Sequence, residues 1–302
     1  MKSNPGGLAI ALSRAIGMIT LVSMLGAASI ALAAEAKQRS FAAPDDAAKA
    51  LVAATKSGDM KAMLDILGPG SRAIVQSGDA VADKAGRERF VKSYEEANQL
   101  EKSGDSKVVL STGKDNWPFP IPIVKDAAGW RFDAKQGREE ILNRRIGRNE
   151  LSAIQVVQAY VDAQREYYLR NPQNDKLLHY AQRIISTQGK RDGLYYPTKS
   201  GEPPSPLGAL FAGGRTYHGY RYRILKQQGP DAPGGAYDYV VQGRMIGGFA
   251  LIAWPASYGN SGVMTFIVNH EGVVYEKDLG LGTAAAVGKI TRFNPDKSWK
   301  RQ

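Results

Sequence analysis

The chain has 302 residues, and its 40 lysines and arginines against 29 aspartates and glutamates give a formal net charge of +11. It contains no cysteine, which excludes a disulfide framework, a thiolate nucleophile and a cysteine-ligated metal. The basic balance suits an anionic partner such as a lipid headgroup or an acidic glycan, although basic residues spread along a chain are more often the surface of a soluble protein.

Residues 1–33 are organised like an export signal. Lys2 and Arg14 precede an apolar run over residues 15–34, and Ala31-Leu32-Ala33 is the small-x-small pattern after which a signal peptidase cuts. No cysteine follows the run and no twin arginine precedes it, so Sec export into the periplasm is expected. Cleavage lowers the net charge to +9, because Lys2 and Arg14 are lost, and leaves no stable membrane span. A retained anchor is the alternative, since about 20 apolar residues can span a bilayer.

Residues 41–148 are predicted to form an α+β domain. Helical spacing of apolar residues begins at Pro44, continues through residues 60–67 and returns over residues 84–99. Strands are predicted at residues 107–111, 121–125 and 129–134. Helices followed by a curved antiparallel sheet resemble a cystatin-like or nuclear-transport-factor-like cone, a shape that often encloses a ligand cavity.

The string Trp117-Pro118-Phe119-Pro120-Ile121-Pro122 is predicted to be extended. Alternating prolines fix the backbone and remove its donors, so the segment suits the edge of a sheet and not a central strand. Packing of Trp117 and Phe119 at this edge is the favoured interpretation. An aromatic lip over a cavity, or a partner site, is the alternative that makes Trp117 a ligand-binding candidate.

Residues 149–214 are predicted to be a helical connector followed by a Pro/Gly-rich loop. A helix is expected from an N-cap at Asn149 to Asn171-Pro172, and a second helix over residues 176–185. The stretch from residue 197 to residue 214 cannot pack regularly and indicates a long surface loop.

Arg144, Arg145 and Arg148 form a basic cluster just before this connector. Such a cluster can hold a phosphate or a carboxylate. The favoured alternative is that the arginines pair with nearby acids, here Glu139, Glu140 or Glu150.

Residues 215–302 are predicted to form an antiparallel β domain. Alternation and glycine punctuation indicate strands over residues 220–225, 245–254, 263–268 and 273–276, with a hairpin turn at residues 269–272. The fold class is therefore α+β, with N-terminal helices and a small sheet, central helices and a C-terminal antiparallel meander.

Several strings in the second half of the chain resemble a bacterial exported family catalogued as domain of unknown function 2950. They are residues 143–151 (NRRIGRNEL), 217–220 (YHGY), 247–255 (GGFALIAWP), 261–266 (SGVMTF) and 274–280 (VYEKDLG). The resemblance covers nearly all of the chain after the export signal and implies no catalytic residues. Members often carry an Asp/Gly-rich loop between the central helices. The matching stretch at residues 172–175 has a single carboxylate, so no calcium site is predicted there.

Little in the sequence points to chemistry. His179, His218 and His270 are too far apart for a metal motif, no nucleophile elbow or phosphate-binding loop is present, and no cofactor is expected. His218 in the string Tyr217-His218-Gly219-Tyr220 is the best candidate for a direct role, with Tyr217 beside it, because it begins a strand after a long loop.

Two hypotheses from different classes follow. The favoured one is a non-catalytic module of the cell envelope that binds an envelope protein or an anionic envelope polymer. The alternative is an envelope-directed hydrolase that uses His218 with a carboxylate such as Asp238 or Glu271. A pilin-like structural subunit is a third possibility and requires the apolar segment to be retained. Nucleic acid is not an expected partner, because no recognisable binding module is present.

Overall fold

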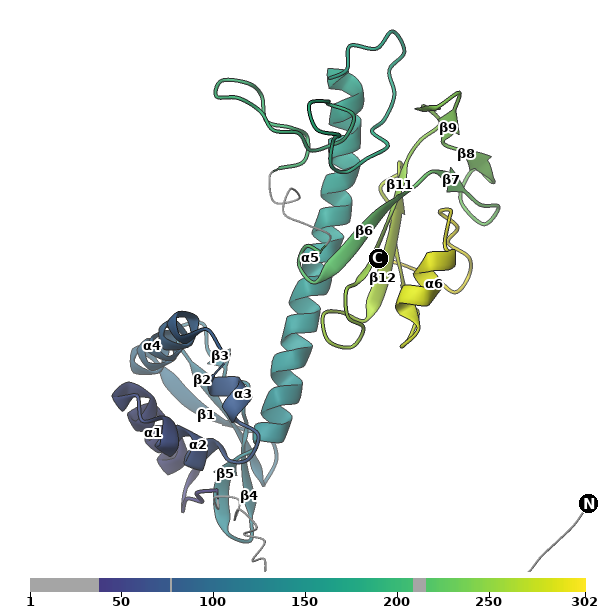
Figure 1. The fold of residues 1–302 in the computed structure, drawn as a ribbon. Helices are drawn as coiled ribbons and strands as arrows, with labels where there is room; N and C mark the ends of the chain where they lie inside the picture. Colours follow the sequence, from purple (N-terminus) through teal and green to yellow (C-terminus); the bar gives the residue numbers. More distant parts are fainter. Residues whose placement is uncertain (1–37, 77, 209–215) are drawn as a thin grey trace, which may run out of the picture. The chain divides into compact units, whose positions relative to one another are not determined.

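The computed structural model describes residues 38–76, 78–208 and 216–302. The predicted export signal and residues 209–215 of the Pro/Gly-rich loop lie outside the described residues. The described residues form helices and antiparallel sheets, a mixed α+β fold that ends in an antiparallel meander (Figure 1). The predicted fold class is confirmed. None of the helices in the described ranges combines the length and the apolar character needed to cross a membrane.

The N-terminal helices are α1 (Pro44–Ser57), α2 (Met60–Leu67), α3 (Arg72–Val75) and α4 (Ala80–Glu96). Aspartate side chains cap two of them: Asp59 accepts from the amide of Ala62 at 2.9 Å, and Asp79 accepts from two amides of α4. The cap at Asp79 explains why α4 begins before residue 84, where the sequence analysis placed its start.

The N-terminal sheet contains β1 (Asn98–Lys102), β2 (Lys107–Thr112), β3 (Trp117–Pro118), β4 (Ile123–Asp126) and β5 (Gly129–Phe132). Its order is β1-β2-β4-β5, with β3 paired to β2. The short β3 agrees with the extended edge segment predicted from the prolines. β1 was not predicted, because its burial pattern is nearly all exposed and the preceding helix was extended to residue 99. Leu51, Met63, Leu110, Ile121 and Phe132 are among the buried residues of this core.

Helix α5 (Ala134–Arg170) begins before Asn149, where the sequence analysis expected it, so that prediction is wrong. The N-cap is Asp133, whose side chain accepts from the amide of Gln136 at 3.0 Å. Buried positions are dense only in the second half of the helix, from Ala153 to Tyr167. The first half lacks an apolar stripe, so hydrophobic periodicity does not reveal it.

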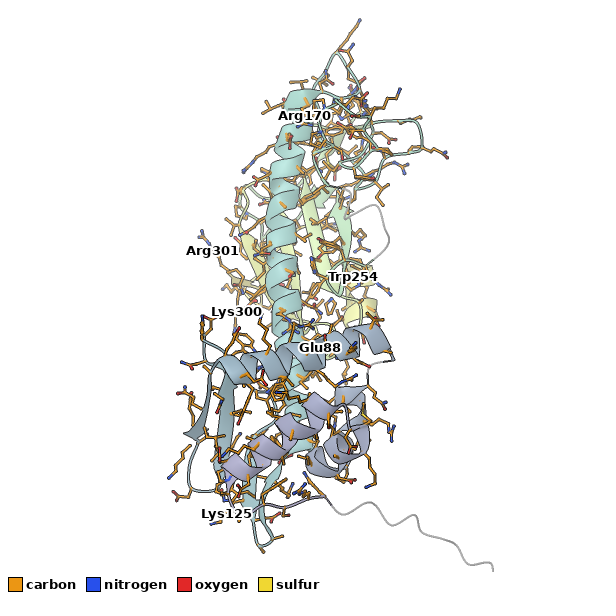
Figure 2. The ribbon with its side chains drawn as sticks, turned by 90° about the vertical axis from the view of Figure 1, so that its left-hand side faces the viewer. Glu88, Lys125, Arg170, Trp254, Lys300 and Arg301 are labelled. Carbon is orange, nitrogen blue, oxygen red and sulfur yellow. The ribbon has the colours of Figure 1, made fainter. Side chains whose placement is uncertain are left out.

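The predicted helix over residues 176–185 is also wrong, because this segment is irregular. Its backbone pairs with distant partners: the amide of Tyr180 donates to the carbonyl of Met245 at 2.8 Å, and that of Ala181 donates to the Gln164 side chain at 2.8 Å. Further along, Arg170 at the end of α5 (labelled in Figure 2) donates to the carbonyl of Pro204 in the Pro/Gly-rich loop.

The C-terminal sheet has the order β14-β13-β12-β11-β6. Its strands are β6 (Tyr220–Leu225), β11 (Ala250–Pro255), β12 (Met264–Asn269), β13 (Val274–Asp278) and β14 (Lys300–Arg301). Two small hairpins lie between β6 and β11: β7 (Gln227–Gln228) with β8 (Tyr237–Asp238), and β9 (Val240–Val241) with β10 (Arg244–Met245). The strand predicted over residues 245–254 is thus divided at Gly247-Gly248 into β10 and β11.

Helices cover both faces of this sheet (Figure 1). α5 packs against β11, β12 and β13, and α6 (Thr283–Lys289) packs against β11. Arg223 fixes α6, because its guanidinium donates to the carbonyls of Val287 and Ile290 at 2.7 Å each and lies 5.8 Å from the ring of Trp254.

Candidate functional site

Three of the strings that carry the family resemblance meet at one junction between α5, the turn before β6 and the loop before β12. The side-chain amide of Asn149 donates to the carbonyl of Ser261 at 2.8 Å. The carboxylate of Glu150 accepts from the amides of Val263 and Met264 at 2.8 and 3.0 Å. Asn149 and Glu150 therefore act as partners for loop backbone, and this part of the family pattern has a structural explanation.

The string at residues 217–220 is a tight turn. Tyr217 and Tyr220 exchange backbone hydrogen bonds of 2.9 and 3.0 Å, and His218 and Gly219 between them have φ angles of 49° and 74°. Two left-handed residues in succession are the geometry of a type I′ turn. A Cβ at Gly219 would lie 2.6 Å from the side-chain nitrogen Nδ2 of Asn149, so glycine is required for the turn to approach α5.

The imidazole of His218 is exposed and packs edge-on against the ring of Tyr217, with 4.1 Å between centroids. Among the described residues, no hydrogen bond or ion pair joins His218 to Asp238 or Glu271. The geometry thus gives His218 a place in a turn, and it provides no support for the proposed pairing with a carboxylate.

The three arginines of the predicted cluster do not form one site. Arg144 pairs with Glu140 at 2.7 Å, donates to the carbonyl of Pro118 at 2.7 Å and lies 5.5 Å from the ring of Trp117. Trp117 is 61% exposed. Arg145 instead donates to the side chain of Asn260, and the exposed Arg148 makes no ion pair with any described residue. Pairing with an acid is therefore found for Arg144.

A polar cavity of about 730 Å³ lies in the C-terminal half of the chain. It is formed by the irregular segment after α5, the residue before β7 and the β9–β10 turn. Gln242 and Gly243, with φ angles of 51° and 77°, make this turn and place Arg244 at the cavity. The lining residues are Gln173, Asp175, His179, Tyr180, Gln182, Arg183, Asp192, Lys226, Gln242, Gly243 and Arg244.

Both carboxylates of the cavity already have partners. Asp175 lies 2.7 Å from Nε2 of His179. Asp192 accepts from the amide and hydroxyl of Thr187 at 2.7 and 2.8 Å. Burial opposes ionisation of Asp192, but the hydrogen bonds from Thr187 outweigh it and hold the pKa of this carboxyl below its ordinary value.

The cationic side chains of the cavity have weaker interactions with the described residues than the carboxylates have. Lys226 donates to the neutral side chain of Gln182 at 3.0 Å, and Arg183 lies 3.8 Å from Asp192. Arg244 is exposed and forms no ion pair within the described ranges. The lining therefore has three cations and two carboxylates, and both carboxylates already have partners. The net charge of the lining is positive.

The cavity contains no free histidine nitrogen. Nε2 of His179 contacts Asp175, and Nδ1 lies 3.1 Å from the carbonyl of Tyr180. Both contacts are to acceptors, and a neutral imidazole can donate to only one of them at a time. Across the described residues, no group of three or more histidine, aspartate or glutamate side chains could hold a metal ion. The lining of the cavity includes no serine, threonine or cysteine side chain that is paired with a base.

This cavity could not be predicted from the sequence. Its lining residues come from segments that lie dozens of positions apart in the chain. A helix was predicted over residues 176–185, and a helix gives the wrong directions for the side chains of this irregular segment. The spacing of Asp175 and His179 was the one local signal, and it is too common to identify a site alone.

The fold and the cavity together define a mixed α+β protein with a polar cavity, lined by more basic than acidic side chains, in its C-terminal half. The family model described as Protein of unknown function (DUF2950) matches residues 38–302, and the chain belongs to this family. The resemblance recognised in the sequence is therefore confirmed. No curated protein and no solved structure matches the chain.

Proposed function

We propose that this protein is an exported, non-catalytic binding module of the periplasm, whose polar cavity holds an anionic group of an envelope polymer or of an envelope protein. The observation that carries the proposal is the set of three cations, Arg183, Lys226 and Arg244, around one cavity of about 730 Å³. This volume lies within the range of about 300–1,000 Å³ that is typical of ligand pockets.

Lys226 and Arg244 are the primary ligand-binding residues in this proposal. Charge-assisted hydrogen bonds from lysine and arginine to carboxylate or phosphate are shorter and stronger than neutral ones. Lys226 can exchange its hydrogen bond with Gln182 for one to the ligand, and the exposed Arg244 gives up no ion pair with a described residue. The side-chain amide of Gln182 already donates to the carbonyl of Gly243 at 2.7 Å, so it also fixes the turn that carries Arg244.

Binding without catalysis agrees with the positions of two of the three histidines. At the cavity, the ring of His179 lies between the carboxylate of Asp175 and the carbonyl of Tyr180, while His218 lies on an exposed turn and does not line this cavity. A positive charge of +9 on the chain without its first 33 residues would attract an acidic polymer over a distance of about 10 Å at 0.1 M salt.

A titration of the double variant Lys226→Gln/Arg244→Gln tests the proposal. Inorganic phosphate and poly-glutamate are the probes, and binding is followed by calorimetry and by amide NMR shifts at residues 240–246. We expect both probes to bind the native chain and to bind the variant at least tenfold more weakly, because each lost charge-assisted hydrogen bond is worth about 1.5–3 kcal/mol.

Arg292→Gln/Lys297→Gln is the matched control, because it removes the same charge from exposed residues outside the cavity. Unchanged affinity in the control supports a specific site. Equal weakening in both double variants means attraction by net charge alone and rejects the cavity, as does failure of the native chain to bind either probe.

A further inference from the structure

A second recess lies in the N-terminal half of the chain, between the helices and the segment that follows β3. Its volume is about 220 Å³. Apolar side chains from α1, α2, α3 and α4 and from the Pro-rich segment make most of its lining, which consists of Leu51, Thr55, Met63, Leu67, Ile74, Val75, Ala82, Asp83, Gly86, Arg87, Phe90, Phe119 and Ile121.

The innermost residues of this recess are apolar, and the one hydroxyl among them is used within its own helix. Leu51, Met63 and Ile121 are each at most 2% exposed and belong to the N-terminal core. The hydroxyl of Thr55 donates to the carbonyl of Leu51 at 2.7 Å, so it is turned back to its own helix. The buried floor of the recess is therefore hydrocarbon, and Asp83 and Arg87 are the charged residues of its lining.

Helix α4 covers the recess without filling it. None of the 17 residues of α4 is buried, although its recess-facing positions 82, 83, 86, 87 and 90 follow helical spacing. The ring of Phe90 packs on Phe119 at 4.9 Å between centroids. One turn earlier stands Gly86, where an added Cβ would meet only the guanidinium of Arg89, at 3.8 Å. Glu88, labelled on α4 in Figure 2, is exposed and lies outside the recess.

We propose that this recess is a second binding site, for a small uncharged apolar molecule such as a single ring or a hydrocarbon chain of about six to ten carbons. An apolar cavity of about 150 Å³ in another protein stays dry and binds benzene, and pockets for drug-sized ligands start at about 300 Å³. A recess of 220 Å³ lies between these sizes and is too small for a helix or strand of a partner. Asp83 and Arg87 both line it, so no net charge selects an ion.

Methyl NMR of the full chain tests this site, with toluene and n-hexanol as probes. We expect the Met63 methyl resonance to move in a saturable way with both probes. Glycerol should leave it unchanged, because a polar molecule gains nothing on an apolar surface. In Gly86→Leu the new side chain occupies the space under α4, and the apparent affinity should fall at least tenfold.

Gly147→Leu is the matched control, because Gly147 is a second helical glycine whose added Cβ meets no close neighbour, and it does not line the recess. Ala82→Leu, on the same face of α4, is a second filling variant should Gly86→Leu fail to fold. A Met63 methyl that ignores both probes, or probe binding that is equal in the native chain and the filled variants, overturns the proposal. Phosphate binding at the C-terminal cavity should be unaffected by Gly86→Leu, so the two sites fail independently.

Discussion

Glu150 is a charged residue whose carboxylate accepts hydrogen bonds from backbone amides. Its carboxylate accepts two amide hydrogen bonds from residues 113 and 114 positions later in the chain. An acidic residue next to arginines suggests a salt bridge from sequence alone. The structure assigns it a different role, because the last residue before β12 and the first residue of β12 turn their amides toward α5.

Glu150→Ala is expected to lower the free energy of unfolding by about 1–3 kcal/mol, because the amides of Val263 and Met264 lose their acceptor. Urea unfolding measures the effect. Glu139→Ala, which removes an exposed acid from the same helix, should change stability by less than about 0.5 kcal/mol. Equal losses in the two variants would show that the hydrogen bonds of Glu150 contribute nothing beyond its charge.

At the scale of elements, α5 contains two glycines with opposite surroundings. An added Cβ at Gly137 would lie 2.7 Å from the side chain of Ile121, whereas one at Gly147 would have nothing within 4 Å. The first glycine permits close packing of the helix on the Pro-rich segment. The second has no such contact, and only its low helix propensity distinguishes it from alanine.

Alanine at these two positions should therefore act in opposite directions. Gly147→Ala is expected to raise the free energy of unfolding by about 0.5–1 kcal/mol through helix propensity. Gly137→Ala should lower the free energy of unfolding. Overpacking against Ile121 costs about 1–3 kcal/mol, which exceeds the gain in helix propensity. Denaturant midpoints of the two variants, measured side by side, test the pair. A stabilised Gly137→Ala would show that Ile121 can move aside.

The elements that could be predicted from sequence are those with a local signal. α1, α2, β2 and β6 have clear apolar periodicity, and the prolines at 118, 120 and 122 restrict their segment to an edge. Strand β1 is mostly exposed and the first half of α5 has no apolar stripe, so hydrophobic periodicity reveals neither of them. The irregular segment at residues 176–185 depends on partners far along the chain, such as Met245 for Tyr180. The polar cavity and the apolar recess could not be predicted, because each is assembled from several such segments.

At the scale of the whole molecule, the N-terminal segment predicts that the basic chain is exported to the periplasm. Export through Sec and cleavage after Ala33 should give a mature chain that begins at Ala34. Mass spectrometry of the intact protein from a periplasmic extract checks this. Recovery of the chain from the membrane with its first residues retained would contradict cleavage and would favour the anchored or pilin-like alternative.

The long helix α5 also sets an order of events during synthesis. The hydroxyl of Tyr160 donates to the carbonyl of Ala250, 90 residues later. At a synthesis rate of about 5–20 residues per second, the apolar stripe of α5 waits roughly 5–20 s for the strands that cover it. The N-terminal sheet has no such delay, because β1 pairs with β2 and β4 with β5 across short connections. Because the proposed Sec route delivers an unfolded chain, the same order applies as the segments emerge across the membrane, and α5 is the element whose apolar stripe waits for its partner strands.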